Sequence, residues 1–454
     1  MESLKKTLGA FGNALKIVDL RTKILFTLAV LIVYRVGGHI TVPGVDPQRL
    51  AGFFAQNSNN LFGLYDAFTG GAFAKATIFA LGIMPYISAS IAIQLMGSVI
   101  PTIQMLQKEG MDGRAKLNQW TRYFTVVLAA LQSWGISVWL SNIRVNVDGL
   151  QGVSVLLDSF ASGAGNVGFR LLATLTMTTG TIFIMYLGEQ ITARGIGNGI
   201  SLIIFAGIVG NLPLAVYREF EQFAAGNAAL MTEIIVIGVV VSIVAFIVFM
   251  EQANRRIPLQ SPRRVVGRKV MGGQSSYLPF KVNTAGVIPV IFSSSIMFVP
   301  AMLASWAPNI SWVQSFAQAF LPGHITYSVI FALLIVFFAY FYTAIQYNPN
   351  DIAENLKKSG GFIPGIRPGR KTAEYIDHIL TRITLPGAMF LAFISVAPLH
   401  IKDALNMQFY IGGTSVLIVV GVALDTLRQI EAQLHTKNYE GFLKHGRIRG
   451  RVAS

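Results

Sequence analysis

The stretch GIMPYISAS, residues 82–90, places a proline and two serines inside an apolar run of the sequence. A second stretch, GVIPVIFSSS at residues 286–295, repeats its pattern. In both, a glycine lies three residues before the proline, an isoleucine two residues after it and a serine five residues after it. The match predicts an internal repeat; the alternative is a chance likeness between two membrane helices, in which Gly and Pro are common.

The chain as a whole is far more apolar and poorer in charge than a soluble domain. Its 454 residues are 53% hydrophobic and 13% charged, with a mean hydropathy of +0.56. These values indicate an integral membrane protein. The sequence contains no cysteine, which excludes disulfides, thiol chemistry and Cys-ligated metals. The basic N-terminus and the apolar run after it lack a signal-peptide cleavage site, so we expect the run to be kept as the first span.

Ten apolar segments are long enough to cross a bilayer as helices, which takes about 20 residues each. They lie near residues 24–40, 74–97, 123–140, 171–188, 200–217, 231–250, 284–304, 327–346, 383–400 and 409–425. The predicted fold class is therefore all-α, a polytopic membrane protein of ten transmembrane helices that form one membrane domain over residues 1–454.

The two repeated stretches fall in the second and seventh spans, so the offset between them is five spans. An odd offset reverses the direction in which the second copy crosses the membrane, as in many transport proteins built from inverted repeats. We therefore expect two inverted five-helix halves, residues 1–225 and 226–454. Broken spans at corresponding positions of such halves also point to a pathway at the interface between them.

The loops between the spans alternate in basic content. The side that holds both termini carries 29 of the 36 Lys and Arg residues, and the positive-inside rule places this side in the cytosol. The two longest loops on that side, 251–283 and 347–382, hold more positive charge than orientation requires. Either this charge only orients the chain, or these loops bind an acidic or RNA-containing partner.

A short amphipathic helix is predicted ahead of the second span, in LFGLYDAFTGGAF at residues 61–73, and it ends at a glycine pair. The helix is too short to cross the membrane. It can lie on the outer surface, which spacing alone favours, or fold back into the membrane where protein surrounds its backbone.

Several function classes are excluded by what the spans lack. The middle of each span holds no Asp, Glu, Lys, Arg or His, which counts against ion-coupled transporters and proton pumps. No HExxH or GxSxG motif is present, and GIRPGRKT (365–372) and GIGNG (195–199) each miss a residue that nucleotide-binding motifs need. We therefore expect no enzyme, no cofactor and no metal site. A passive protein channel and a small-molecule facilitator remain.

Isoleucines at helical spacing occur in two spans, as the i, i+4 pairs Ile83 with Ile87 and Ile200 with Ile204. Taken alone, each pair is explained by ordinary packing or by contact with lipid. Spacing by itself does not predict a pore.

Six separated blocks of the chain resemble the SecY family, the channel subunits of the bacterial Sec protein translocase. The blocks are YRVGGHITVPGVD (34–46), TGGAFAKATIFALGIMPYISASIAIQL (69–95), RGIGNGISLIIFAGIV (194–209), LPFKVNTAGVIPVIFSSS (278–295), NPNDIAENLKKSGGFIPGIRPG (348–369) and FYIGGTSVLIVVGVALD (409–425). The resemblance extends from about Lys16 into the C-terminal tail. It implies a passive channel for unfolded, signal-bearing polypeptides, which also releases transmembrane helices sideways into lipid.

The resemblance also implies roles for particular residues. A ring of apolar side chains pinches the pore in this family, and the matching positions are Ile83, Ile87, Ile200, Ile204, Ile291 and Ile418. A plug half-helix replaces the surface helix, and its matching residues are Leu61, Phe62, Gly63, Leu64, Tyr65, Asp66, Ala67, Phe68, Thr69, Gly70 and Gly71. A lateral gate is expected at Pro85, Ser88, Pro289, Ser295 and Val299. Within it, Pro85 and Pro289 are expected to interrupt two facing helices and so to ease their movement.

Partners follow from the same resemblance. Arg255, Arg256 and Arg367 match basic residues that engage the motor ATPase SecA or the ribosome, so loops 252–281 and 346–375 are expected to be docking loops. The other expected partners are the SecE and SecG subunits, signal peptides, nascent membrane proteins, SecDF, YidC and the lipid bilayer. The expected location is the bacterial plasma (inner) membrane, with both termini in the cytoplasm.

Overall fold

The fold was analysed in a computed structural model of the chain. It describes residues 17–56, 66, 69–147, 150–160, 164–224, 230–260, 264–266, 269–271, 275–306, 311–320, 324–405 and 412–445. Most of these residues are helical. All statements below about the structure refer to these ranges.

Helices dominate both parts of the chain. Before residue 225 they are α2 (Val18–Gly37), α3 (Pro47–Gln56), α5 (Met84–Val99), α6 (Pro101–Lys108), α7 (Met111–Asn142), α8 (Ala164–Arg194) and α9 (Gly199–Ala224). After it they are α10 (Leu230–Gln252), α11 (Ile288–Trp306), α12 (Ser311–Ala319), α13 (Ile325–Gln346), α14 (Pro349–Lys358), α15 (Arg370–Leu405) and α16 (Gly413–His445). Each of the ten predicted spans overlaps one of these helices.

Length and composition alone qualify six helices in the described ranges as membrane spans, or seven if the bent pair α5 and α6 counts as one. The six lie in α7, α8, α10, α13, α15 and α16. The apolar parts of α9 and α11 are shorter, Gly199–Pro213 and Ile288–Pro300. The chain is thus a mostly helical polytopic membrane protein, as its sequence predicts.

Strands occur only as three small antiparallel pairs in the described part of the chain. They are β1 (Arg144–Val147) with β2 (Leu150–Ser154), β3 (Asn254–Gln260) with β6 (Ser275–Lys281), and β4 (Arg264–Val266) with β5 (Lys269–Met271). The sequence analysis did not predict these pairs. All of them lie in segments between the predicted spans, so they leave the helical fold class unchanged.

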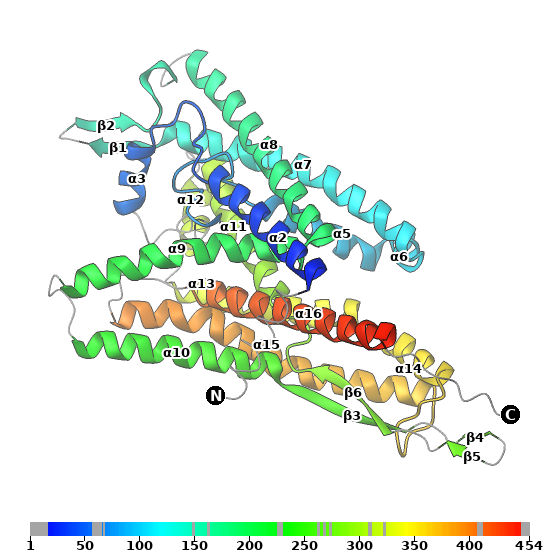
Figure 1. Ribbon diagram of the computed structural model, residues 1–454. Helices are drawn as coiled ribbons and strands as arrows, with labels where there is room; N and C mark the ends of the chain where they lie inside the picture. The colour runs from blue at the N-terminus through cyan, green and yellow to red at the C-terminus, as the bar shows by residue number, and fades with distance from the viewer. Residues whose placement is uncertain are drawn as a thin grey trace.

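Two helices join two groups of helices into one body. Figure 1 shows α2, α5, α7 and α8 in one slanted group and α10, α13, α15 and α16 in another. Between them, α9 packs on α2 and α8 of the first group and on α16 of the second, while α11 packs on α5 and α7 and on α13. Segments far apart in the sequence therefore meet along α9 and α11.

The start of the second span differs from the prediction. Residues 70–83 are mostly buried but not helical, and α5 begins only at Met84. The expectation of a helix from residue 74 is therefore wrong. Positive φ angles at Ala76 and Gly82 explain the difference, because this left-handed conformation interrupts a right-handed helix.

Candidate functional site

The six isoleucines of the predicted ring lie in one contiguous hydrophobic cluster. Five are buried members of this cluster, and Ile200 is half-buried and packs against it. They come from four separate parts of the chain. Ile83 and Ile87 lie at the start of α5, Ile200 and Ile204 on α9, Ile291 on α11 and Ile418 on α16. All six predicted residues thus belong to one large cluster, which also includes residues of α2, α3, α7 and α8.

Neighbouring positions on α16 show how the helix sorts its side chains. Ile418 and Leu417 are both 0% exposed, but Ile418 belongs to the cluster with the other isoleucines and Leu417 to a second cluster formed by α10, α11, α13 and α15. Successive residues of a helix point about 100° apart, so they meet different neighbours. α16 therefore contributes residues to both cores.

The chemistry of the isoleucine region is that of a seal. Its side chains carry no group that could replace the water of an ion, and an apolar constriction resists wetting. Isoleucine is branched at Cβ and stiff at χ1, so its shape is well defined. Such a region can close around an extended chain without recognising the sequence of that chain.

The two repeated stretches have the same backbone geometry. Gly82 and Gly286 both have positive φ, +56° and +63°, and a helix begins two residues after each of them. Pro85 and Pro289 are then the second residues of α5 and α11. The shared conformation supports the repeat that the sequence predicts.

This geometry corrects the role expected for the two prolines. We expected Pro85 and Pro289 to interrupt the middle of helices, but both lie in the first turn, where a backbone N–H has no intrahelical acceptor in any case. The prolines therefore start these helices and remove no internal hydrogen bond. The serines that follow bond within α11: Ser293 donates to the Pro289 carbonyl at 2.8 Å, and Ser295 to the Ile291 carbonyl at 2.9 Å.

The predicted gate residues lie on two helices that pack against each other, α5 and α11. Pro85 and Pro289 are buried, and Ser88 and Ser295 are half-buried. Val299 is 48% exposed on the outside of α11. The set thus runs from the buried start of the two helices to the exposed surface of α11.

Only part of the predicted plug can be placed. Leu61 to Tyr65, Ala67 and Phe68 lie outside the described residues, whereas Asp66, Thr69, Gly70 and Gly71 lie within them. The Asp66 carboxylate accepts the Ala74 N–H at 2.7 Å, and the Asp66 carbonyl accepts the Gly71 N–H at 3.1 Å. Asp66 therefore caps the turn that leads from the predicted plug into residues 70–83.

The sequence analysis missed Arg35, which lies in the last turn of α2. Its guanidinium donates hydrogen bonds to the Gly70 carbonyl (3.1 Å), the Gly210 carbonyl (2.8 Å) and the Asn211 side chain (3.2 Å). The signal in the sequence was a charged residue within the predicted span 24–40, and the sequence analysis did not single it out.

The two predicted docking loops form a single unit. Gln260 of β3 and Phe362 exchange two backbone hydrogen bonds of 2.9 Å. A separate small core lies beneath them, with Ile257 and Phe280 from the β3–β6 pair and Ile363 from the second loop packed against α15. The structure thus builds one platform, β3, β6 and residues 346–375, from segments about 100 residues apart.

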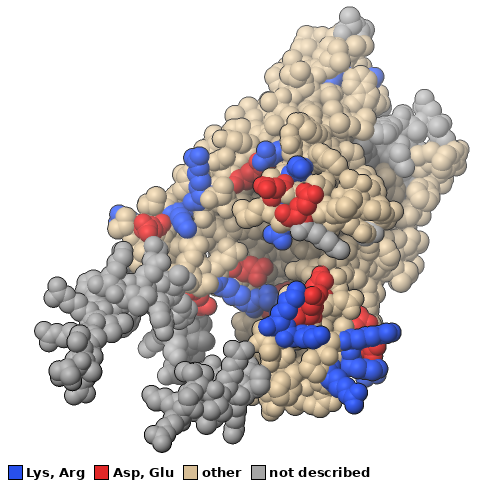
Figure 2. Space-filling model, turned by 90° about the vertical axis from the view of Figure 1, so that its right-hand side faces the viewer, with Lys and Arg blue, Asp and Glu red and all other residues tan. Residues whose placement is uncertain are grey.

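The platform exposes unpaired positive charge. Arg255 and Arg256 on β3 are exposed, as is Arg367 after Gly365, and none of the three makes an ion pair within the described ranges. Glu354 and Glu374 of the platform, in contrast, form ion pairs with neighbouring basic residues, and Lys358 beside Glu354 lowers the pKa of that carboxyl. Figure 2 shows charged side chains gathered on this end of the molecule. Most of the remaining surface in that view is uncharged.

A buried polar cluster lies at the base of the platform. The side chain of Glu251, at the end of α10, accepts a hydrogen bond from Asn283, which precedes α11. The Glu251 carbonyl accepts one from Arg428 of α16 at 3.1 Å. Since β3 begins three residues after Glu251, the base of the platform is tied to both α11 and α16.

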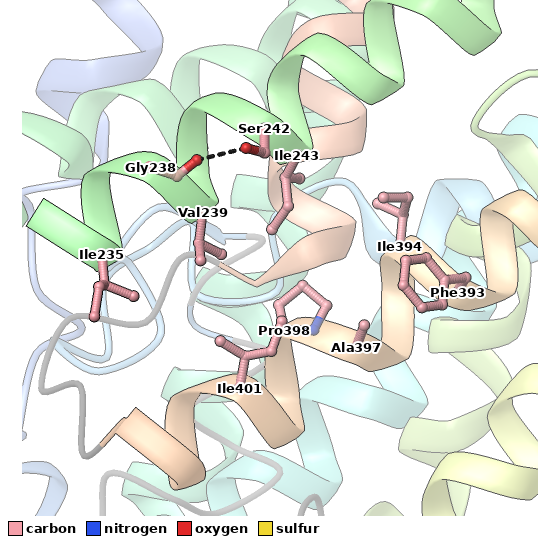
Figure 3. A pocket seen from close by; sticks show the side chains of 10 residues that line it. All are labelled: Ile235, Gly238, Val239, Ser242, Ile243, Phe393, Ile394, Ala397, Pro398 and Ile401. Carbon is pink, nitrogen blue, oxygen red and sulfur yellow. Dashed lines mark hydrogen bonds between the residues drawn. The ribbon is translucent and has the colours of Figure 1, made fainter. Parts of the chain in front are cut away.

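A groove of about 380 Å³ lies between α10 and α15 (Figure 3). Its walls are Ile235, Gly238, Val239, Ser242, Ile243, Phe393, Ile394, Ala397, Pro398 and Ile401. The Ser242 hydroxyl donates to the Gly238 carbonyl of its own helix at 2.7 Å (Figure 3). Because its lining is apolar and its one hydroxyl is already bonded, the groove suits hydrocarbon and offers little to orient a polar solute.

Comparison with known proteins agrees with this arrangement. The sequence pattern of the SecY family matches residues 77–427. The chain is 47% identical over 435 residues to the protein translocase subunit SecY of Pseudomonas aeruginosa, an alignment that covers 95% of each chain.

Solved structures share the fold at much lower sequence identity. One, described as the structure of a protein conducting channel, superposes with a TM-score of 0.64 at 17% identity and covers 93% of this chain and 95% of its own. Another, Sec61 in the canine ribosome-channel complex from the endoplasmic reticulum, gives a TM-score of 0.60 with the same identity and coverage.

Proposed function

The chain belongs to the SecY family of protein translocase subunits, and from this premise we propose that it is the central channel subunit of a Sec translocon. In this function it is a passive gated pore. It conducts unfolded, signal-bearing polypeptides across the membrane and releases transmembrane helices sideways into lipid. An external motor or the ribosome supplies the energy.

The observation that supports this proposal is that six isoleucines of α5, α9, α11 and α16 belong to one large hydrophobic cluster. A pore for proteins must admit chains of any sequence and still block ions. Stiff apolar side chains meet both demands, because they bind no ion and no particular sequence. A facilitator for a polar solute would instead need polar groups at its constriction to orient that solute.

Opening in this proposal separates α5 and α11, the helices that carry Pro85, Ser88, Pro289, Ser295 and Val299. A signal helix can shift the equilibrium only by its different affinity for the closed and open forms. The closed form must therefore be only slightly favoured. The half-buried hydroxyls of Ser88 and Ser295 support this role, since small polar side chains pack less extensively than large apolar ones.

The platform is proposed as the docking surface for SecA or the ribosome. Arg255, Arg256 and Arg367 are exposed and unpaired within the described ranges, which suits a partner rich in carboxylate or phosphate. A protein of the same fold is described in a ribosome-channel complex. Docking can reach the pore through Glu251, whose contacts join the base of the platform to α11 and α16.

We further propose the assembly and location that the family implies. The partners are SecE and SecG, signal peptides and nascent membrane proteins, with SecDF and YidC as further associates, in a bacterial plasma membrane with both termini cytoplasmic. Residues 1–225 and 226–454 form the two inverted halves. The equivalent geometry around Gly82 and Gly286 supports this division.

Crosslinking tests the proposal directly, because the chain has no native cysteine and any introduced thiol is unique. Ile83→Cys, Ile204→Cys and Ile418→Cys are each reconstituted with the small subunits, and a preprotein is stalled in transit by a folded tag. All three thiols are expected to crosslink to the same translocating segment, while Leu417→Cys, which belongs to the second hydrophobic cluster, should not. Crosslinks at one position only, or equal crosslinking at residue 417, would refute the pore.

A further inference from the structure

We propose that Arg35 is a positioning residue that latches the turn at Gly70 and Gly71 onto α9 and so holds the channel closed. The inference rests on the proposed function, in which this turn ends the plug. It adds a residue and a mechanism: one guanidinium on α2 joins the turn to α9, and opening requires that its bond to the turn be released.

The hydrogen bonds of Arg35 connect three separate segments. One nitrogen, Nη1, donates to the Gly70 carbonyl at 3.1 Å. The other, Nη2, donates to the Gly210 carbonyl at 2.8 Å and to the Asn211 side chain at 3.2 Å, both on α9. The planar fork of arginine fixes these donors relative to one another, so a single side chain sets the position of the turn against the helix.

Close packing holds the same turn from the other side. A Cβ atom on Gly70 would lie 2.5 Å from the Gly207 carbonyl oxygen, and one on Gly71 would lie 3.3 Å from the Asn211 side chain. A Cβ on Gly210 would lie 2.6 Å from the Arg35 guanidinium carbon. Glycine at these positions lets the turn, the arginine and α9 approach more closely than side chains permit.

The electrostatic cost of a charge in a span makes the latch effective. Arg35 is half-buried near the outer end of α2, between the buried Tyr34 and the exposed, apolar Val36. A guanidinium at such a position is stable only when its donors are satisfied. Two of its three acceptors belong to α9, and the third is the Gly70 carbonyl. In the closed position the turn therefore supplies one of the three acceptors of the Arg35 guanidinium. Movement of the turn away from Arg35 removes that acceptor.

Hydrogen bonds tie the turn to the residues around it. The Asp66 carboxylate accepts the Ala74 N–H, and the Thr69 hydroxyl accepts the Phe73 N–H at 3.2 Å. These bonds close the chain on itself on both sides of Gly70. A latch at one carbonyl can therefore hold the whole turn.

The test uses a thiol reporter in the assembled complex, reconstituted into vesicles with its small subunits. Thr69→Cys, buried in the turn, reports opening through its rate of reaction with a membrane-impermeant maleimide added from outside. All variants are compared within this background, so the loss of the Thr69 hydroxyl is common to them. Ser395→Cys, 1% exposed on α15 and remote from the turn in the sequence, reports general loosening of the fold. The parent chain contributes no thiol.

Arg35→Met keeps the length of the side chain and removes its donors. It is expected to accelerate labelling of Thr69→Cys about tenfold, as expected for the loss of one charged hydrogen bond, and to leave labelling of Ser395→Cys unchanged. Arg35→Lys retains the charge and should restore part of the protection. Asn211→Ala removes one acceptor of Arg35 and should accelerate labelling of Thr69→Cys about threefold. It replaces Arg35→Met as the test variant if Arg35→Met does not assemble.

Two results would overturn the latch: labelling of Thr69→Cys that is unchanged in both Arg35→Met and Asn211→Ala, or equal acceleration at both reporters. A preprotein stalled in the parent complex distinguishes failure of the latch from failure of the proposed function. If the stalled chain exposes Thr69→Cys but the variants do not, the latch is wrong and the plug stands. If the stalled chain does not expose it, the plug and the latch both fail.

Discussion

Replacement of Ile418 by asparagine tests the seal most sharply, because α16 supplies a matched control at the next position. Ile418 and Leu417 are both 0% exposed, and they belong to different hydrophobic clusters. Ile418→Asn places an amide in the isoleucine region, whereas Leu417→Asn places the same amide in the second core. The two variants therefore share their chemistry and burial and differ only in where the amide lies.

Both variants are expected to lose similar folding stability. Removing a fully buried Ile or Leu side chain costs about 1.5–3 kcal/mol. Burying an amide without a partner adds about 1–3 kcal/mol on the scale of protein mutations. The two variants should differ in channel gating. When the constriction fills with water, the amide at residue 418 can form hydrogen bonds with that water. The free-energy cost of the unpaired amide therefore falls on the closed state alone. The ratio of open to closed channels should rise about 5- to 150-fold.

Ion conductance of proteoliposomes that contain the complex measures this difference. Ile418→Asn is expected to conduct without a signal peptide, and Leu417→Asn to remain as closed as the parent at the same expression and thermal stability. Ile418→Leu preserves volume and polarity and should also stay closed. Equal conductance of Ile418→Asn and Leu417→Asn would refute the seal, because stability alone would then explain both.

Charge reversal of Arg255 and Arg256 to Glu is expected to weaken ribosome binding, measured by co-sedimentation. The slope of log affinity against log salt concentration should become smaller by about 1 per arginine. An unchanged slope would place the contact elsewhere. Pro85→Ala and Pro289→Ala are expected to shift Tm by only a few degrees, because a residue in the first turn has no intrahelical acceptor for its N–H. A loss of about 3 kcal/mol or more in the free energy of unfolding of either variant would contradict this. Gly286→Ala is expected to lower the free energy of unfolding by about 1–2 kcal/mol, measured by thermal unfolding. The φ of +63° is the only source of this cost, since no atom lies within 4 Å of the added Cβ. An unchanged stability would show that the turn relaxes.

The ring and the latch show how far sequence reasoning reaches. Resemblance to a family identified the six isoleucines, and the structure gathers them in one cluster. Arg35 escaped notice because its acceptors at Gly70 and Gly210 lie 35 and 175 residues away, and no local pattern encodes such pairs. The prolines of the repeat were visible in the sequence, but their role was misjudged because the helix start at Met84 depends on the buried segment before it.

The sequence by itself determined the membrane class and the positions of the apolar segments, and it predicted their orientation and the repeat. These properties depend on local composition and on the number of basic residues per loop, which can be counted along the chain. Only the tertiary structure decided where α5 and α11 begin, that the two basic loops share one platform, and which acceptors surround Arg35. Each of these depends on contacts between residues far apart in the sequence, where packing and hydrogen bonding override local preference.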